Sequence, residues 1–271
     1  MSRENDTTFN VRNNGKERDK IIQYWNYALL CSLESSTSHT HPDLAYLDNA
    51  IENHVLAALL DDWMEKSRIR CLDVGAGYGR FANLFRQNYL ETVLLEPAER
   101  IFSKLSELWS GTPNIRCVNK DFELYSTEDK YDLIFVSGVV YLYRDSLLDE
   151  FMRKATSMLT DGGLLVFRDF ISESQPQIIK SSYINDSFCY YRTIEFWINY
   201  AKLHKVKLLD IKRSKPQLSW LRNSRTIKVL SKFKLTRLYR NAFFINAIIH
   251  LGNFKIDRGG LQTVYIGMKK S

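Results

Sequence analysis

The stretch from Ile69 to Arg80 constrains the fold of this chain more than any other. It opens with a short, mostly apolar run that contains Asp73 and is typical of a buried strand. Alternating glycines follow, as in a turn that needs positive φ or room for a ligand. A helical pattern comes next, and the N–H groups at its start face the turn. We therefore predict a strand, a turn for a nucleoside-type ligand with an acidic group, and a helix. The glycines are Gly75, Gly77 and Gly79.

Two of the three strands that we predict after this turn end in residues suited to a nucleoside. Thr92 to Glu96 ends in a carboxylate 19 residues after Gly77, the distance at which an acid accepts hydrogen bonds from ribose hydroxyls. Asn114 to Lys120 is followed by Asp121 and Phe122, an acid and an aromatic ring suited to an adenine amino group and ring face. The fourth strand is predicted from Tyr131 to Ser137.

These motifs together resemble the class I S-adenosylmethionine-dependent methyltransferases. The resemblance covers Ile69 to Arg213 and a last strand near the C-terminus. It implies that S-adenosylmethionine (SAM) binds at the carboxyl ends of the strands. A dinucleotide-binding dehydrogenase is the alternative, but its fingerprint has a small residue where this chain has Arg80, whose guanidinium suits the methionine carboxylate. The implied cofactor-binding residues are Tyr24, Trp25, Asp73, Gly75, Ala76, Gly77, Arg80, Glu96, Pro97, Asp121, Phe122, Ser137 and Gly138.

The rest of the pattern predicts an α/β protein with a Rossmann-like, mostly parallel sheet of seven strands. Strands and helices alternate after the glycine turn, which favours parallel strands with right-handed crossovers. By the resemblance, the last strand is antiparallel and lies between the fifth and sixth. The later predicted elements are helices at Ala98–Trp109, at Asp145 (as cap) to Leu159 and at Thr193–His204, strands at Leu164–Arg168, Val206–Arg213 and Gln262–Lys269, a tight turn at Asp161–Gly163 and a linker at Ile171–Asp186.

Two helical additions to this core are predicted, one before the first strand and one before the last. A helical pattern starts at Lys20, and a second helix, capped by Asp43, continues to Lys66. The aromatic residues Tyr24 and Trp25 either line the ligand pocket or pack on the core. We divide the chain into a tail and helical cap (1–66), a SAM-binding core (67–213), a basic helical insert (214–260) and the last core strand (261–271).

Composition favours a reducing, cytoplasmic setting. The four cysteines (Cys31, Cys71, Cys117 and Cys189) lie far apart and predict neither disulfides nor a metal site. The polar N-terminus has no signal-peptide pattern, and the longest apolar run, Ala242 to Leu251, is too short to span a bilayer. Net charge is +7 at pH 7, and Asp210 is the only acid between Lys202 and Arg240. Such a stretch is either a solvated basic face or a surface for a polyanion or membrane.

The sequence favours nitrogen as the methyl acceptor. Methyl transfer needs alignment and a group that receives a proton from the acceptor. Asp169, delivered by the fifth strand, and Tyr141, after the fourth, are the candidate catalytic residues, although Asp169 could cap a loop and Tyr141 could pack under the cofactor. A hydroxyl acceptor more often needs a histidine base or a metal, and no histidine lies at the predicted strand ends.

A looser resemblance, to the protein N-terminal α-amine methyltransferases, rests on the glycine turn with Arg80, on Arg168-Asp169 and on 186–189 with Arg192. In that family the Asp helps to receive the substrate amine. This chain departs from it at Phe170, where the family has Asn, and in the insert. We expect a small-molecule, sugar or peptide amine as acceptor. Alternatives are a metabolite O-methyltransferase and a non-enzymatic scaffold; a nucleic-acid substrate is disfavoured because the base-pocket motif is missing after the fourth strand. The oligomeric state is left open.

Overall fold

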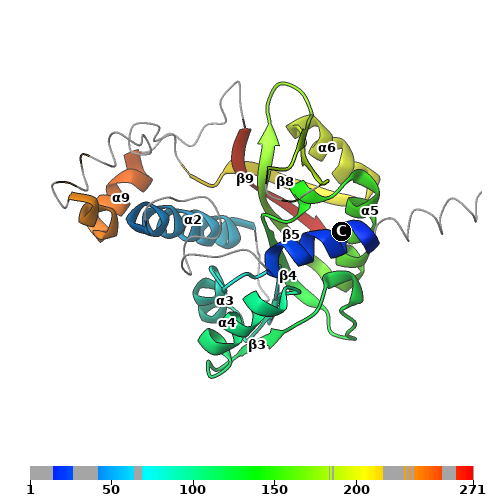
Figure 1. Ribbon diagram of the computed structural model, residues 1–271, viewed down its shortest axis with the longest axis horizontal. Helices are drawn as coiled ribbons and strands as arrows, with labels where there is room; N and C mark the ends of the chain where they lie inside the picture. Colours follow the sequence, from blue (N-terminus) through cyan, green and yellow to red (C-terminus); the bar gives the residue numbers. More distant parts are fainter. Residues whose placement is uncertain are drawn as a thin grey trace, which may run out of the picture.

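The computed structural model describes residues 15–26, 42–63, 69–182, 184, 186–215, 229, 232, 235–251 and 261–270. Within these residues a seven-stranded sheet has the order β3-β2-β1-β4-β5-β9-β8 (Figure 1). The first five strands of this order run parallel, and β9 is antiparallel to both of its neighbours, so the predicted topology is confirmed. The strands are β1 (Arg70–Val74), β2 (Glu91–Leu95), β3 (Ile115–Val118), β4 (Tyr131–Ser137), β5 (Leu159–Ser172), β8 (Val206–Arg213) and β9 (Leu261–Lys270).

Helices cover both faces of the sheet. The alternating side chains of β5 show the two sides: Phe167 packs with Phe151 of α5 and Trp197 of α6, whereas Val166 joins a cluster with Phe81 and Phe85 next to α3. This period-two burial follows from the pleat of a strand that is covered on both faces. The helices are α2 (Pro42–Trp63), α3 (Ala82–Asn88), α4 (Glu99–Trp109), α5 (Asp145–Met158), α6 (Ile194–Leu203) and α9 (Ala242–Leu251), with short 3-10 turns η1 (Phe122–Leu124), η2 (Val140–Leu142) and η3 (Leu235–Arg240).

The predicted linker from Ile171 to Asp186 is wrong in part. The strand β5 continues to Ser172, and β6 (Gln177–Lys180) pairs with β7 (Phe188–Tyr191) as a separate antiparallel hairpin. Its sequence does not alternate cleanly between apolar and polar residues, so the period that identifies a half-buried strand is missing. The fifth strand also starts earlier than predicted, and the Asp161–Gly163 turn lies within it as an irregularity in its pairing with β4.

Two predicted helix caps are also wrong. Asp145 is the first residue of α5 instead of its cap, and its carboxylate accepts a 2.8 Å hydrogen bond from Arg192. Asp43 lies inside α2, which starts at Pro42, a residue suited to the first helical turn because it has no N–H to leave unpaired.

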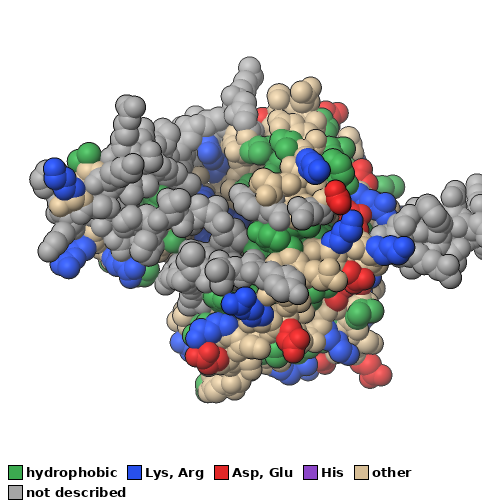
Figure 2. Space-filling model, viewed as in Figure 1, with side chains coloured by type: hydrophobic (Ala, Val, Ile, Leu, Met, Phe, Trp, Pro, Cys, Tyr) green, Lys and Arg blue, Asp and Glu red, His purple; other side chains and the backbone are tan. Residues whose placement is uncertain are grey.

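The helical regions outside the core pack on each other. Leu47 and Ile51 of α2 share a buried cluster with Ile245 and Ile248 of α9, so the end of the predicted insert lies against the N-terminal helix (Figure 1). A further helix covers residues 15–26, five residues earlier than the predicted start. In the described part of the chain, no helix is both long and apolar enough for a membrane span. Exposed Lys and Arg side chains of this region are seen in Figure 2.

Candidate functional site

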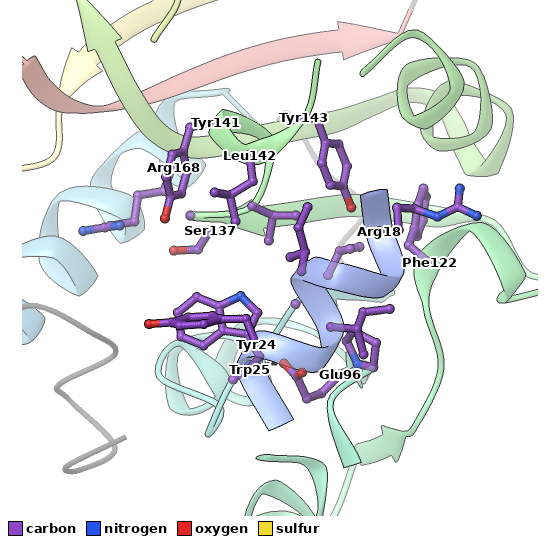
Figure 3. Close-up of a pocket in the computed structure, with 18 of the residues that line it drawn as sticks. Arg18, Tyr24, Trp25, Glu96, Phe122, Ser137, Tyr141, Leu142, Tyr143 and Arg168 are labelled. Carbon is purple, nitrogen blue, oxygen red and sulfur yellow. Dashed lines mark hydrogen bonds between the residues drawn. The ribbon is translucent and has the colours of Figure 1, made fainter. Parts of the chain in front are cut away.

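A cavity of about 380 Å³ lies at the carboxyl ends of β1, β2, β4 and β5. The glycine turn after β1 forms its floor, Glu96 and Asp121 form one end, and residues that follow β4, β5 and β8 form the other. The helix of residues 15–26 crosses it, with Arg18, Tyr24 and Trp25 on the cavity side (Figure 3). The carboxyl edge of the sheet, where α/β proteins bind ligands, is thus covered by this helix.

The glycine turn leaves open space above its backbone. Gly77 has φ 59°, and a Cβ added there would meet no atom within 4 Å. Gly75 has φ 70°, and its Cβ would come within 2.7 Å of the Val139 side chain. Backbone N–H groups of Gly75 and Ala76 donate to the carbonyl of Leu95 at 2.9 and 3.0 Å, so the turn is fastened to β2. An ordinary side chain at 77 would fill space that a ligand can use.

Glu96 is held at the end of β2 by the turn. Its Oε2 accepts from Gly77 N–H and its Oε1 from Ala98 N–H, both at 2.9 Å. Burial raises its pKa to about 7, although these two hydrogen bonds act to lower it. Burial, and then the nearby Glu96, raise the pKa of Asp73 to about 8. The predicted ribose acid therefore faces the loop that contains Gly77.

The other nucleoside residues lie on the same side. Phe122 is buried in the cavity wall with Leu142 opposite, an arrangement that suits a flat ring (Figure 3). Asp121 also lines the wall, and its Oδ2 lies 3.2 Å from Nε of Arg18 in the covering helix. A base bound between these residues would meet both the acid and its arginine partner.

At the opposite end, five charged residues form what we call the Glu52 cluster: Asp48, Glu52, Arg80, Arg168 and Lys215. Arg168 donates to both oxygens of Glu52, at 2.9 and 2.8 Å, and Arg80 donates to Oε2. Lys215 Nζ lies 2.9 Å from Asp48 and 3.6 Å from Glu52. Burial acts to raise the pKa of Glu52, but the three cations, Arg168 first, hold it well below its ordinary value.

The two predicted catalytic residues occupy different positions. Tyr141 lines the cavity and belongs to what we call the aromatic wall, which consists of Tyr141, Phe170 and Tyr191 with ring centroids 5.1 to 6.3 Å apart. Asp169 is buried behind this wall and does not line the cavity. Burial raises its pKa to about 7, opposed first by the backbone N–H of Phe170. Its Oδ1 has no hydrogen-bond partner among the described residues.

Most of the residues predicted from the sequence come together in the lining of the cavity. Those that line the cavity are Tyr24, Trp25, Gly75, Gly77, Arg80, Glu96, Pro97, Asp121, Phe122, Ser137, Gly138 and Tyr141. Asp73, Ala76 and Asp169 lie behind it. Tyr24 and Trp25 do both things that the sequence left open, because they line the cavity and also pack against the core.

Several wall residues were missed by the sequence interpretation. Cys189 and Tyr191 come from the unpredicted hairpin, and Lys215 from the start of the insert. Arg168 was named in the sequence motif but given no role. Arg18 lies one helical turn before Ile21 and Ile22, so the helical periodicity could have included it. It was missed because the predicted helix begins at Lys20, whereas the observed helix begins at residue 15.

A family model described as a methyltransferase domain matches residues 45–244, well over half of the chain. The chain belongs to this family of methyltransferase domains. With the class I topology and the cavity at its sheet edge, the protein is a SAM-dependent methyltransferase, as predicted, and the dehydrogenase alternative is discarded. A search of curated proteins finds no match.

Solved structures share this fold at low sequence identity. A SAM-dependent methyltransferase from Leishmania major is 19% identical with a TM-score of 0.59, over 73% of this chain and 75% of that chain. A Burkholderia thailandensis 1,6-didemethyltoxoflavin-N1-methyltransferase, bound to its substrate and S-adenosylhomocysteine, is 13% identical with a TM-score of 0.56, over 83% and 78%. The N-methyltransferase NodS from Bradyrhizobium japonicum, bound to S-adenosylhomocysteine, is 11% identical with a TM-score of 0.52, over 89% and 94%.

Proposed function

We propose that this methyltransferase transfers the methyl group to a nitrogen atom of a small-molecule, sugar or peptide acceptor. The observation that supports this most is the aromatic wall, placed between the cofactor side of the cavity, at Ser137 and Gly138, and the Glu52 cluster. A nitrogen that accepts a methyl group gains positive charge as the bond forms. Aromatic ring faces attract such a charge, most strongly where water is displaced. Two of the similar solved structures carry the name N-methyltransferase.

The residues that would hold SAM in this proposal are those that line the cavity at the ends of β1 and β2 and next to β3. Glu96 would accept hydrogen bonds from the ribose hydroxyls, Phe122 would lie against the adenine, and the open space over Gly77 would take the methionine end. Bound SAM supplies an activated methyl group on its sulfonium. The geometry of this chain supports the fit of the methionine end, because a Cβ at position 77 would occupy the open space above the turn.

Alignment of the acceptor falls to the aromatic wall. The Tyr141 hydroxyl, at the cavity surface, would accept a hydrogen bond from the acceptor amine and so direct its lone pair toward the cofactor (Figure 3). Asp169 lies behind, where the backbone N–H groups of Phe170 and Tyr141 act on its carboxylate. We therefore assign Tyr141 as the catalytic residue and Asp169 as a positioning residue.

A labelling experiment tests the acceptor atom. The protein is incubated with SAM carrying a ¹³C-methyl group and a pool of candidate small molecules and peptides, and the products are examined by carbon-correlated NMR, in which N-methyl and O-methyl groups differ. An N-methyl product that is strongly reduced in Tyr141→Phe, with unchanged affinity for S-adenosylhomocysteine, supports the proposal. A product carrying only O-methyl groups overturns it.

A further inference from the structure

The acceptor side of the cavity is built with positive charge facing inward and negative charge behind. Arg80, Arg168 and Lys215 all line the cavity, whereas Glu52 and Asp48 do not. The cations are themselves largely buried, with side chains 10 to 13% exposed, and Glu52 is fully buried. Within this cluster, as the described residues have it, one positive charge is in excess. Such a charge in a poorly solvated wall is best satisfied by an anion.

Even with its carboxylate at Arg80, the cofactor brings no net negative charge to this cavity. The amino-acid end of SAM is a zwitterion, and its sulfonium adds a positive charge. Arg80 belongs to the glycine turn after β1 and lies near the expected methionine end. Arg168 instead lies in β5, opposite the last residue of β4, and Lys215 lies two residues beyond β8. The sheet order places β5 and β8 beyond β4, on the side away from β2 and Glu96. These two cations therefore face the space left for the acceptor.

Lys215 is held in this position by the fold. The backbone N–H of Ser214 donates to the Thr263 carbonyl of β9 at 3.0 Å, and the Ser214 hydroxyl donates to Glu52 at 3.0 Å. Both contacts fix the residue that precedes Lys215, and Thr263 itself lines the cavity. The ion pair with Asp48 also orients the Lys215 side chain, so little side-chain entropy is lost when it binds an anion.

We propose that the methyl acceptor is an amine that also carries an acid group, a carboxylate or a phosphate ester. The acid binds at Arg168 and Lys215, and the amine lies against the aromatic wall of Tyr141, Phe170 and Tyr191. The two cations and the aromatic wall line one cavity, so both ends of a single molecule can bind there at once. The inference rests on the proposed function, because it takes the aromatic wall as the site of the accepting nitrogen.

Binding of small probes tests the acid site without knowledge of the acceptor. Protein saturated with S-adenosylhomocysteine is titrated by calorimetry with benzoate, phenyl phosphate and the neutral benzamide. We expect the better of the two anions to bind about ten-fold more tightly than benzamide, as one charge-assisted hydrogen bond suggests. Which anion binds better distinguishes a carboxylate from a phosphate ester. In Lys215→Gln this preference should fall to about three-fold or less.

The control is Lys207→Gln, since Lys207 is an exposed lysine of β8 away from the cavity, and it should keep the full preference. Arg168→Lys, which keeps the charge but not the forked contact with Glu52, provides a second variant should Lys215→Gln fold poorly; it should weaken anion binding less than removal of the charge. Equal or absent binding of all three probes overturns the inference, and so does a preference that survives in Lys215→Gln. Loss of S-adenosylhomocysteine binding itself would instead count against the proposed function.

Discussion

Glu52 and Arg168 lie 116 residues apart in the chain and meet in a forked ion pair, with Nε–Oε2 and Nη2–Oε1 distances of 2.9 and 2.8 Å. The pair joins α2 to β5. Glu52 is fully buried, so neither water nor a surface counterion can replace its partner. The geometry is the planar bidentate match that guanidinium and carboxylate groups favour.

Breaking this pair from one side should be costly. We expect Arg168→Met to lower the free energy of unfolding by about 3 to 5 kcal/mol, because it removes the forked partner of a buried carboxylate. Urea denaturation measures the change. The exposed pair Lys104–Glu107 offers a control: Lys104→Met should cost less than about 1 kcal/mol. An Arg168→Met protein as stable as the control variant would contradict the importance of the pair.

The raised pKa of Glu96 predicts a pH-dependent stability of the ligand-free protein. In the folded state this carboxyl keeps its proton up to about pH 7, against an ordinary value of 4.5. Between these pH values the folded state binds more protons than the unfolded state, so the free energy of unfolding falls as pH rises. Glu96→Gln should remove that part of the loss, so its free energy of unfolding should fall less between pH 5 and pH 8 than that of wild type, by on the order of 2 kcal/mol.

Urea denaturation at pH 5 and pH 8 measures this effect, with the exposed Glu128→Gln as the matched control. The same Glu96→Gln protein should bind S-adenosylhomocysteine more weakly, since a neutral amide replaces an acceptor for the ribose hydroxyls. A variant with the reduced pH dependence yet unchanged affinity would show that Glu96 does not contact the ribose.

Gly77→Ala tests the cradle in the glycine turn. Its φ of 59° costs an alanine about 1 kcal/mol, and its methyl group would project into the open space above the turn. We expect at least a ten-fold loss of affinity for S-adenosylhomocysteine by calorimetry, with a small change in melting temperature. Gly111→Ala, at a glycine with equal space and no positive φ, should change neither. Retained affinity in Gly77→Ala would place the ligand elsewhere.

Arg18→Met tests the covering helix of residues 15–26. The Arg18 guanidinium lies among Asp121, Glu123 and Glu150, and it is one of the polar contacts that hold this helix over the cavity. We expect about five-fold weaker binding of S-adenosylhomocysteine, equivalent to about 1 kcal/mol. Lys16→Met, at an exposed position of the same helix, should bind as wild type does. Tighter binding in Arg18→Met would mean that Arg18 competes with the base for Asp121.

Short-range patterns brought together most of the residues that line one end of the cavity. Asp73 to Arg80, Glu96 and Asp121 each stand at the end of a strand whose apolar run is readable, and parallel strands bring such ends to one edge. Local composition gave wrong predictions where a distant partner determines the structure. Asp145 looks like a helix cap but pairs with Arg192. The β6–β7 hairpin was not predicted because its sequence lacks the alternation that identifies a strand.

The sequence by itself determined the parallel strands and the residues at their carboxyl ends that line the cavity, because those depend on periodic burial and on turns of a few residues. Only the tertiary structure decided the acceptor side. Glu52 looks like an ordinary helix acid in the sequence, and Lys215 like one more lysine of a basic stretch. Their roles arise from the contacts of Glu52 with Arg168 and of Lys215 with Asp48, each across more than a hundred residues, which no local spacing encodes.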